Sequence, residues 1–213
     1  MNPKIYTHND LSHEDTIKFG SVIGIMRGAQ LSSAEVEQLH SETETEFRYL
    51  APSGIKDGMI DEDLPYLTSI DKQLERFCLK PNDIILSKIG APFKVALVRP
   101  SEGQKILANG NLYIIRMKEE NKKDVDPCYV KVFLESCTGQ KVLKRISGGS
   151  LMPNVSAEAI KNMDISLPNM PQQKEIAARY LTTADEVVRL RRQLKTALEE
   201  LGDILPPDDC ERM

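Results

Sequence analysis

Cysteine and histidine, the residues that most often hold metals or act as nucleophiles, are few in this chain of 213 residues. The three histidines (His8, His13 and His40) lie apart from the cysteines, and no two cysteines have the Cys-x-x-Cys spacing of a zinc site. We therefore predict no metal site, and reduced thiols in a cytoplasmic protein. The four cysteines are Cys78, Cys128, Cys137 and Cys210.

The sequence contains none of the motifs that mark common catalytic sites. A nucleophile elbow, a phosphate-binding loop and a His-Glu-x-x-His pair are all missing. A methyltransferase would bring a glycine-rich cofactor loop and an Asn/Asp-Pro-Pro-aromatic tetrapeptide, and neither occurs. The Ser-Gly-Gly-Ser run that begins at Ser147 follows no clear parallel strand, and Asp61 and Asp63 fall in a polar loop. We expect a recognition or assembly protein without catalytic residues or a cofactor.

Charge is unevenly distributed along the chain. The net charge is −4, which as a total argues weakly against nucleic acid. Residues 80–161 carry 14 Lys and Arg against 8 Asp and Glu, a balance of +6, whereas the remainder carries 14 against 24, or −10. This asymmetry indicates a modest basic surface on an otherwise acidic protein. Chance segregation of the charges explains it equally well.

Strand patterns come first in the chain and helices are grouped late, an order that favours an α+β domain with a mixed sheet. Hydrophobic residues make up 40% of the chain, enough for a real core, and no apolar run approaches the length of a membrane span. The expected strands are 47–50, 84–89, 95–99 and 112–117, and the expected helices are a capped segment from Ser32 or Ser33, a brief one at 71–79, then 127–136 and 155–160.

One long helix near the end organises the chain. Pro171 suits its first turn, and Pro206 and Pro207 end it. Apolar or small residues follow each other at alternating spacings of four and three, the heptad pattern of a coiled coil. The alternative is an amphipathic helix lying on its own domain. A helix of about 33 residues is about 50 Å long, which favours a partner. The positions are Ile176, Tyr180, Thr183, Val187, Leu190, Leu194, Ala197 and Leu201.

We divide the chain into four parts on these patterns. Residues 1–16 form a flexible lead-in without a signal peptide, and residues 17–168 form the α+β domain. Residues 169–205 form the helical arm, and residues 206–213 are a tail. The predicted fold class is therefore α+β, a mixed-sheet domain followed by a long C-terminal helix that forms a coiled coil.

Three segments stand in the order typical of one family. Phe19–Gly28, Leu79–Gly90 and Ser147–Ala177 together resemble a half-length DNA specificity (S) subunit of a type I restriction–modification system. The last segment is the most specific, with a glycine, a small helix, an Ile-x-Leu-Pro strand, and then Pro and Gln opening the long helix. These features fall at Gly149, Val155-Ser156, Ile165–Pro168, Pro171, Gln173 and Ile176.

The resemblance implies a target recognition domain that reads one half of a bipartite DNA sequence, followed by a conserved helical spacer. Full-length members carry two such units with antiparallel helices, and this chain has one. We therefore expect a homodimer through the C-terminal helix and a two-part palindromic target. The expected partners are double-stranded DNA, a DNA methyltransferase subunit and a restriction subunit. The partner-helix positions are Ile176, Tyr180, Val187, Leu190, Leu194 and Leu201.

The resemblance also directs attention to basic and amide side chains in loops at strand ends. Lys and Arg contact phosphates, and Asn reads base edges. A solvated surface charge explains each cation equally well, and turn formation explains the asparagines. The candidate DNA contacts are Lys88, Lys94, Asn109, Asn111, Lys141, Lys144 and Arg145, with Lys56 and Arg27 as further positions.

Two alternatives stay open on the sequence. The chain could be a recognition domain detached from a fused adenine DNA methyltransferase, which would use the same DNA surface. It could also be a coiled-coil assembly protein that docks on a restriction complex without reading DNA. The overall acidity supports the second alternative.

Overall fold

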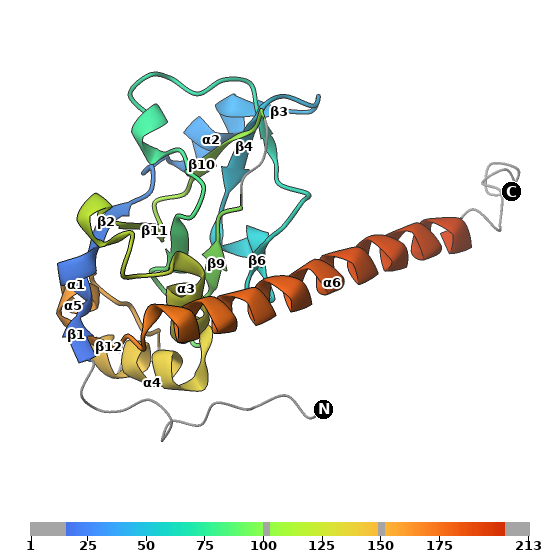
Figure 1. Ribbon diagram of the computed structural model, residues 1–213. Helices are drawn as coiled ribbons and strands as arrows, with labels where there is room; N and C mark the ends of the chain where they lie inside the picture. The colour runs from blue at the N-terminus through green and yellow to red at the C-terminus, as the bar shows by residue number, and fades with distance from the viewer. Residues whose placement is uncertain (1–15, 100–102, 149–151, 203–213) are drawn as a thin grey trace, which may run out of the picture.

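A computed structural model of the chain describes residues 16–99, 103–148 and 152–202. The predicted lead-in and tail, Cys210, and the two prolines expected to end the long helix lie outside these residues, apart from Thr16. The fold is α+β with mixed strand pairing and a long C-terminal helix, as predicted from the sequence (Figure 1). The coiled coil stays a prediction.

An antiparallel sheet in the order β2-β11-β8-β9 lies at the centre. Its strands are β2 (Ile23–Arg27), β11 (Leu112–Met117), β8 (Ile84–Ser87) and β9 (Val95–Leu97). Alternate residues point to opposite faces of a strand, so Ile84 and Leu86 join one core cluster and Ile85 joins another. Both faces are covered, which explains the continuous apolar run of β8.

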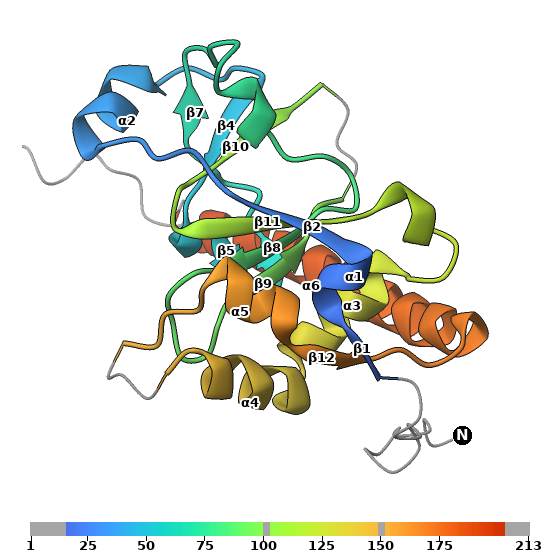
Figure 2. The same cartoon turned by 90° about the vertical axis from the view of Figure 1, so that its left-hand side faces the viewer.

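Helices cover one face of this central sheet (Figure 2). Serine side chains accept backbone hydrogen bonds at the starts of α4 and α5, and Asp126 does the same for α3. At the edge of this layer β1 (Thr16–Lys18) pairs with β12 (Asp164–Ser166), joining the two ends of the domain. The helices are α1 (Phe19–Val22), α3 (Pro127–Glu135), α4 (Cys137–Ile146) and α5 (Ala157–Asn162).

A second, mixed sheet packs beyond the other face. Its order is β10-β4-β7-β3, in which β10 (Lys105–Ala108) runs parallel to β4 (Phe47–Leu50). Helix α2 (Ser33–Leu39) begins with a capping box in which Ser32 and Glu35 satisfy each other's backbone amides, which confirms the predicted cap. The remaining short strands are β3 (His40–Ser41), β7 (Tyr66–Leu67) and the hairpin of β5 (Ile55–Lys56) with β6 (Met59–Ile60).

Two sequence predictions differ from this structure. The segment 71–79 is a series of turns, closed mostly by hydrogen bonds between residues three apart, that ends in a three-residue 3-10 turn (Glu75–Phe77) rather than a brief α-helix. A short segment gains little from α-helical hydrogen bonds, because nucleating the first turn is costly. Strand β10 was not predicted, since its order comes from pairing with β4, far away in the sequence.

Helix α6 (Met170–Gly202) crosses the domain and then projects beyond it (Figure 1). The Asn169 side chain accepts a hydrogen bond from the Gln172 backbone amide at 3.1 Å, so it caps the first turn next to Pro171. The face that packs on the domain includes the buried residues Gln173, Ala177 and Ala184. Helix α6 therefore lies partly on its own domain and partly free of it.

Candidate nucleic-acid interface

Four of the candidate DNA contacts converge on one end of the central sheet. Ser87 pairs with Leu112, and Arg27 pairs with Tyr113. Lys88, Asn111 and Arg27 therefore lie at the same end of the central sheet. Leu86 pairs with Val95, which brings Lys94 to that end of the sheet as well. Figure 2 shows the loop between β8 and β9 at the left, on the same side as the segment that leads into α5. We call residues 27–30, 88–94 and 109–111 the sheet-end surface.

Two of the candidate side chains on the sheet-end surface have no partner within the described residues. The backbone of Lys88 is fixed, because its amide donates to the Asn111 carbonyl at 2.8 Å and its carbonyl accepts from Val155 at 3.0 Å. The Lys88 and Asn111 side chains have no hydrogen bond or ion pair within the described residues. Asn111 is exposed and Lys88 is half-buried. The scaffold thus presents an ammonium group and an amide at fixed positions.

Asn109 and Arg27 build the turn instead. The side-chain nitrogen of Asn109 donates to the Tyr49 hydroxyl at 2.5 Å, and the side-chain oxygen of Asn109 accepts from the Asn111 backbone amide at 2.7 Å. The Arg27 Nε donates to the Gly110 carbonyl at 2.5 Å. Gly28 allows this close approach, since an added Cβ would lie 2.3 Å from the Asn109 carbonyl oxygen. Turn formation therefore accounts for Asn109, whereas Asn111 keeps its side chain available.

Lys94 and Lys56 already have partners inside the chain. The Lys94 ammonium group donates to the Pro52 carbonyl at 2.8 Å. Lys56 pairs with Asp61, and this ammonium group lowers the pKa of the Asp61 carboxyl below its usual value. Both pairs lie around the β5–β6 hairpin, so these two cations have to exchange partners before either can bind a phosphate.

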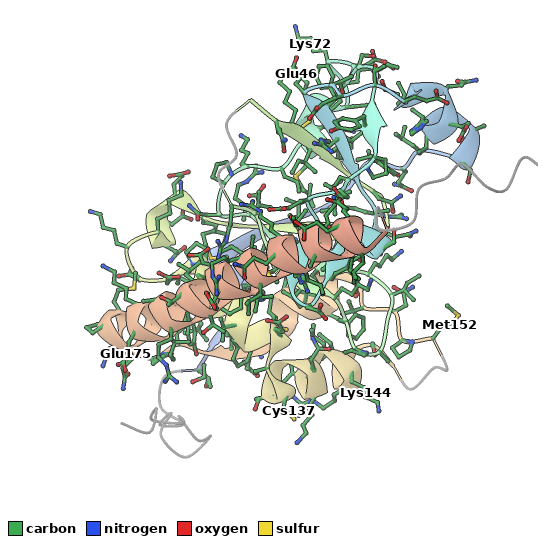
Figure 3. All side chains as sticks on the ribbon, turned by 90° about the vertical axis from the view of Figure 1, so that its right-hand side faces the viewer. Glu46, Lys72, Cys137, Lys144, Met152 and Glu175 are labelled. Carbon is green, nitrogen blue, oxygen red and sulfur yellow. The ribbon has the colours of Figure 1, made fainter. Side chains whose placement is uncertain are left out.

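Three cations project from α4 on the same side of the domain. Lys141, Lys144 and Arg145 are exposed and have no hydrogen bond or ion pair within the described part of the chain. Figure 3 shows Lys144 and Met152 on one side of the molecule and Glu175, near the start of α6, on the other. Lys144 and Arg145 also fall in the last helical turn, where positive charge favours the helix itself.

One residue that was not predicted from the sequence connects α4 to the sheet-end surface. The Gln140 side chain accepts a hydrogen bond from the Phe93 amide at 2.8 Å and donates one to the Phe93 carbonyl at 3.0 Å. It also donates to the Leu134 carbonyl at 2.9 Å. Gln140 therefore holds the loop before β9 against the helix that bears the basic side chains.

Three further exposed residues lie at the sheet-end surface or beside it. Gln30 is exposed beside Gly110, and Ile89 forms an isolated bridge with Asn154 while leaving 40% of its surface exposed. Met152 is 70% exposed. Apolar side chains of this kind can contact thymine methyl groups, and glutamine can read adenine. Their positions were not predicted, because exposure at a loop tip has no distinct sequence pattern.

The predicted apolar positions of α6 divide into two groups. Ile176 packs against the domain core, and the Tyr180 hydroxyl donates to the Gly58 carbonyl at 3.2 Å. Beyond Val187 and Val188, which are half-buried, the apolar side chains are exposed. At about 100° per residue, their stripe is centred about 80° around the helix from the face that packs on the domain. The exposed stripe consists of Leu190 (49% exposed), Leu194 (59%), Leu198 (57%) and Leu201 (62%).

Neither a metal centre nor a membrane span is found in the described ranges. Within residues 16–99, 103–148 and 152–202, no three His, Cys, Asp or Glu side chains are grouped so that they could hold a metal ion. No helix of the same ranges is both long and apolar enough to cross a membrane. The polar groups of the interface are thus amides and cations.

Comparison with known proteins identifies the class to which this fold and surface belong. The sequence model of the family described as "Type I restriction modification DNA specificity domain" matches residues 17–200. The chain belongs to this family, which confirms the resemblance found in the sequence. The match includes both the α+β domain and nearly all of α6.

Particular relatives agree with this assignment. The chain is 25% identical over 154 residues to the EcoBI specificity subunit of a type I restriction enzyme from Escherichia coli, covering 70% of this chain and 31% of the relative. Its fold resembles the S subunit of a type I restriction-modification system from M. genitalium, with a TM-score of 0.62 at 14% identity over 93% of this chain and 46% of that one. The chain thus spans less than half the length of these relatives.

A third similar structure belongs to a different kind of protein. The type IIG restriction endonuclease BpuSI has a TM-score of 0.59 at 9% identity, over 80% of this chain and 27% of that one. At such identity the likeness concerns the fold alone. The same fold therefore occurs both in S subunits and within a longer endonuclease chain.

Proposed function

We propose that this chain is a non-catalytic subunit that recognises one half of a bipartite DNA target for a type I restriction–modification complex. The observation that carries the proposal is the sheet-end surface, where unpaired polar side chains stand on a rigid sheet beside three unpaired cations of α4. A free amide near free cations suits DNA, because cations bind phosphates and amides read base edges. Membership of the specificity-domain family supports the same function.

We assign different contacts to the two parts of this surface. Asn111, Lys88 and Gln30 face base edges, and Lys141, Lys144 and Arg145 contact phosphates. Lys94, Lys56 and Arg27 have partners in the free chain and contribute only after those partners are exchanged. Since few cations of the described interface are free, the isolated chain binds DNA weakly and depends on partners for additional contacts.

A homodimer through the exposed stripe of α6 completes the target-reading unit. An antiparallel pairing centred on Leu194 places Leu190 of one chain opposite Leu198 of the other, and Val187 opposite Leu201. It also brings the basic part of the helix near Glu199 and Glu200 of the second chain, whereas a parallel pairing would place these carboxylates together. Two identical domains related by a two-fold axis would read a palindrome with a gap.

The domain division follows the same proposal. Residues 17–168 act as the target recognition domain, and residues 169–205 act as the spacer and dimerisation arm. The partners are double-stranded DNA, a DNA methyltransferase subunit that supplies the catalysis, and a restriction subunit in complexes that also cleave.

A second candidate function rests on the likeness to BpuSI. In that reading the domain is detached from a single-chain enzyme and contacts DNA through the same surface. The exposed stripe of α6 does not separate the two candidates, because a second chain or the rest of such an enzyme would cover it equally well. A coiled-coil assembly protein, the remaining alternative, would also have the exposed stripe of α6, but it would not need the polar sheet-end surface.

Affinity purification of the tagged chain from its own host tests the proposal. We expect a DNA methyltransferase at comparable amounts, identified by mass spectrometry, and methylated sites that form a two-part palindrome. Recovery of the chain without a methyltransferase would contradict the subunit function. Two results together would favour the assembly protein. The α6 arm alone would capture the methyltransferase, and substitution of Asn111 would leave the methylated sites unchanged.

A further inference from the structure

A buried lysine connects α6 to the recognition domain. Lys131 of α3 has no solvent exposure, and its ammonium group contacts the Glu135 carboxylate at 2.5 Å and the Tyr180 hydroxyl of α6. The same ammonium group lies 3.8 Å from the centre of the Tyr180 ring. A buried ammonium group without partners is costly, so these contacts resist separation.

The β5–β6 hairpin contributes a third element to this point. The Tyr180 hydroxyl donates to the Gly58 carbonyl at 3.2 Å. Gly58 has a φ of 73°, and an added Cβ would lie 1.8 Å from the Glu135 carboxylate. The left-handed backbone therefore favours glycine at this position, and the hairpin backbone lies beside the side-chain ends of Lys131 and Glu135. Helix α3, the hairpin and α6 meet at one polar node, defined here as Lys131, Glu135, Tyr180 and Gly58.

A row of exposed ion pairs continues from the polar node along α6. Asp57 pairs with Arg191, Glu62 pairs with Arg192 at 2.5 Å, and Asp63 pairs with Lys195 at 3.2 Å. Each carboxylate belongs to the hairpin or to the loop after it, and each cation belongs to the helix. Exposed pairs contribute about 0–1 kcal/mol each, but three in succession oppose tilting of the helix in one direction.

The direction of α6 matters because its tip carries the exposed stripe. From Ala184 to Leu201 the helix extends about 25 Å, so a tilt of about 10° moves the tip by about 4 Å. That displacement is about the rise of one base pair. If the arm tilted freely, the distance between two paired domains would therefore vary by about the length of one base pair.

We infer that the polar node and the three ion pairs together form a joint that fixes the angle of α6, and that this joint sets the gap length between the two half-sites. The inference rests on the proposed function, since a gap exists only for a two-part target. Tyr180 and the carboxylates of Asp57, Glu62 and Asp63 act here as positioning residues, because they connect the arm to the domain and do not contact DNA. The gap then depends on the joint as well as on the length of the arm.

The first experiment measures the joint without DNA. Spin labels at Lys72→Cys and Thr196→Cys, in a full chain whose native cysteines are replaced by alanine and which is diluted with unlabelled chain, report one intramolecular distance. The joint variant combines Tyr180→Phe with Asp57→Asn, Glu62→Gln and Asp63→Asn. We expect its distance distribution to broaden at least twofold. The control, Glu186→Gln, breaks the exposed pair of Glu186 with Arg189 inside α6 and should leave the distribution narrow.

The second experiment measures the gap. The chain purified with its methyltransferase is tested on duplexes that carry its own methylated target, with the gap unchanged or altered by one base pair. We expect the joint variant to lose about tenfold in discrimination between these duplexes while it methylates the original target. An unchanged distance distribution, or a broadened one with unchanged gap discrimination, would overturn the inference. If the unmodified complex recognises no two-part target, the proposed function fails first, and the two failures are thereby distinguished.

Discussion

Gln173 and Asp126 join the start of the arm to the start of a domain helix. The Gln173 side chain accepts a hydrogen bond from the Asp126 backbone amide at 2.9 Å, and it donates to the Asp124 and Pro168 carbonyls at 3.0 and 2.8 Å. Asp126 in turn caps α3 through the amides of Cys128 and Tyr129. One buried amide, 1% exposed, thus satisfies three backbone groups.

Gln173→Ala should lower the free energy of unfolding by about 2–3 kcal/mol, because a buried amide and two carbonyls lose their partner. Chemical denaturation measures this change. Gln172→Ala is the matched control, since among the described residues that side chain makes no hydrogen bond and only its backbone amide donates to Asn169. A loss in the control as large as in Gln173→Ala would show that helix propensity, rather than the buried contacts, explains the effect.

Lys144→Ala combined with Arg145→Ala should weaken DNA binding and flatten its dependence on salt. Each lost phosphate contact reduces the slope of log affinity against log salt by about 0.9, so two contacts reduce it by about 2. Fluorescence anisotropy of the methyltransferase complex at several salt concentrations measures both quantities. The control variant, Lys72→Ala with Lys123→Ala, removes the same charge elsewhere. An unchanged slope, or an equal loss in the control, would exclude α4 as a phosphate-binding helix.

Asn109 and Asn111 provide a matched pair that separates structure from recognition. Asn109→Ala should cost about 1–2 kcal/mol of folding stability, because it removes the hydrogen bonds to Tyr49 and to the Asn111 amide. Asn111→Ala should leave stability unchanged and reduce discrimination at one base pair by about 1–3 kcal/mol. Thermal unfolding and a binding assay with single-base substitutions measure the two effects. Discrimination lost by Asn109→Ala alone would reverse these assignments.

The sequence predicted the parts of this fold that depend on local patterns. The apolar runs of β8 and β11 and the caps at Ser32 and Ser156 all gave clear signals, and the structure confirms them. Strand β10 and the contacts of Gln140 were not predicted, because each depends on a segment far away in the chain. Local periodicity contains no information about such pairings.

The candidate site was predicted in outline, and only the structure separates its members. The sequence placed Lys88, Lys94, Asn109 and Asn111 in loops at strand ends, and the register of the central sheet brings these positions together with Arg27, which was expected in a turn. Which side chains are free could not be predicted, because the partners of the others are backbone carbonyls or distant carboxylates. The sequence does not show which backbone carbonyl group will accept a hydrogen bond from a given side chain.

Cys128 and Cys137 should differ in reactivity although they are nine residues apart. Burial raises the pKa of the Cys128 thiol to about 11, so at pH 8 only about 0.1% of it is thiolate, and the group is 6% exposed. Cys137 is exposed at the start of α4. Iodoacetamide should label Cys137 in the folded chain and Cys128 only after unfolding, as peptide mass spectrometry can measure. Labelling of folded Cys128 at the rate of Cys137 would contradict this packing of α3 against α6.

Leu194→Glu should abolish self-association through α6. In the antiparallel pairing Leu194 lies opposite its own copy, so the substitution removes apolar contact at the centre and places two like charges together. Sedimentation velocity over a range of concentrations should show a dimer for the unmodified chain and a monomer for the variant. Gln193→Glu adds the same charge about 100° away around the helix and should leave the dimer intact. Dissociation by both substitutions would indicate a general charge effect, and dissociation by neither would exclude the exposed stripe as the contact between chains.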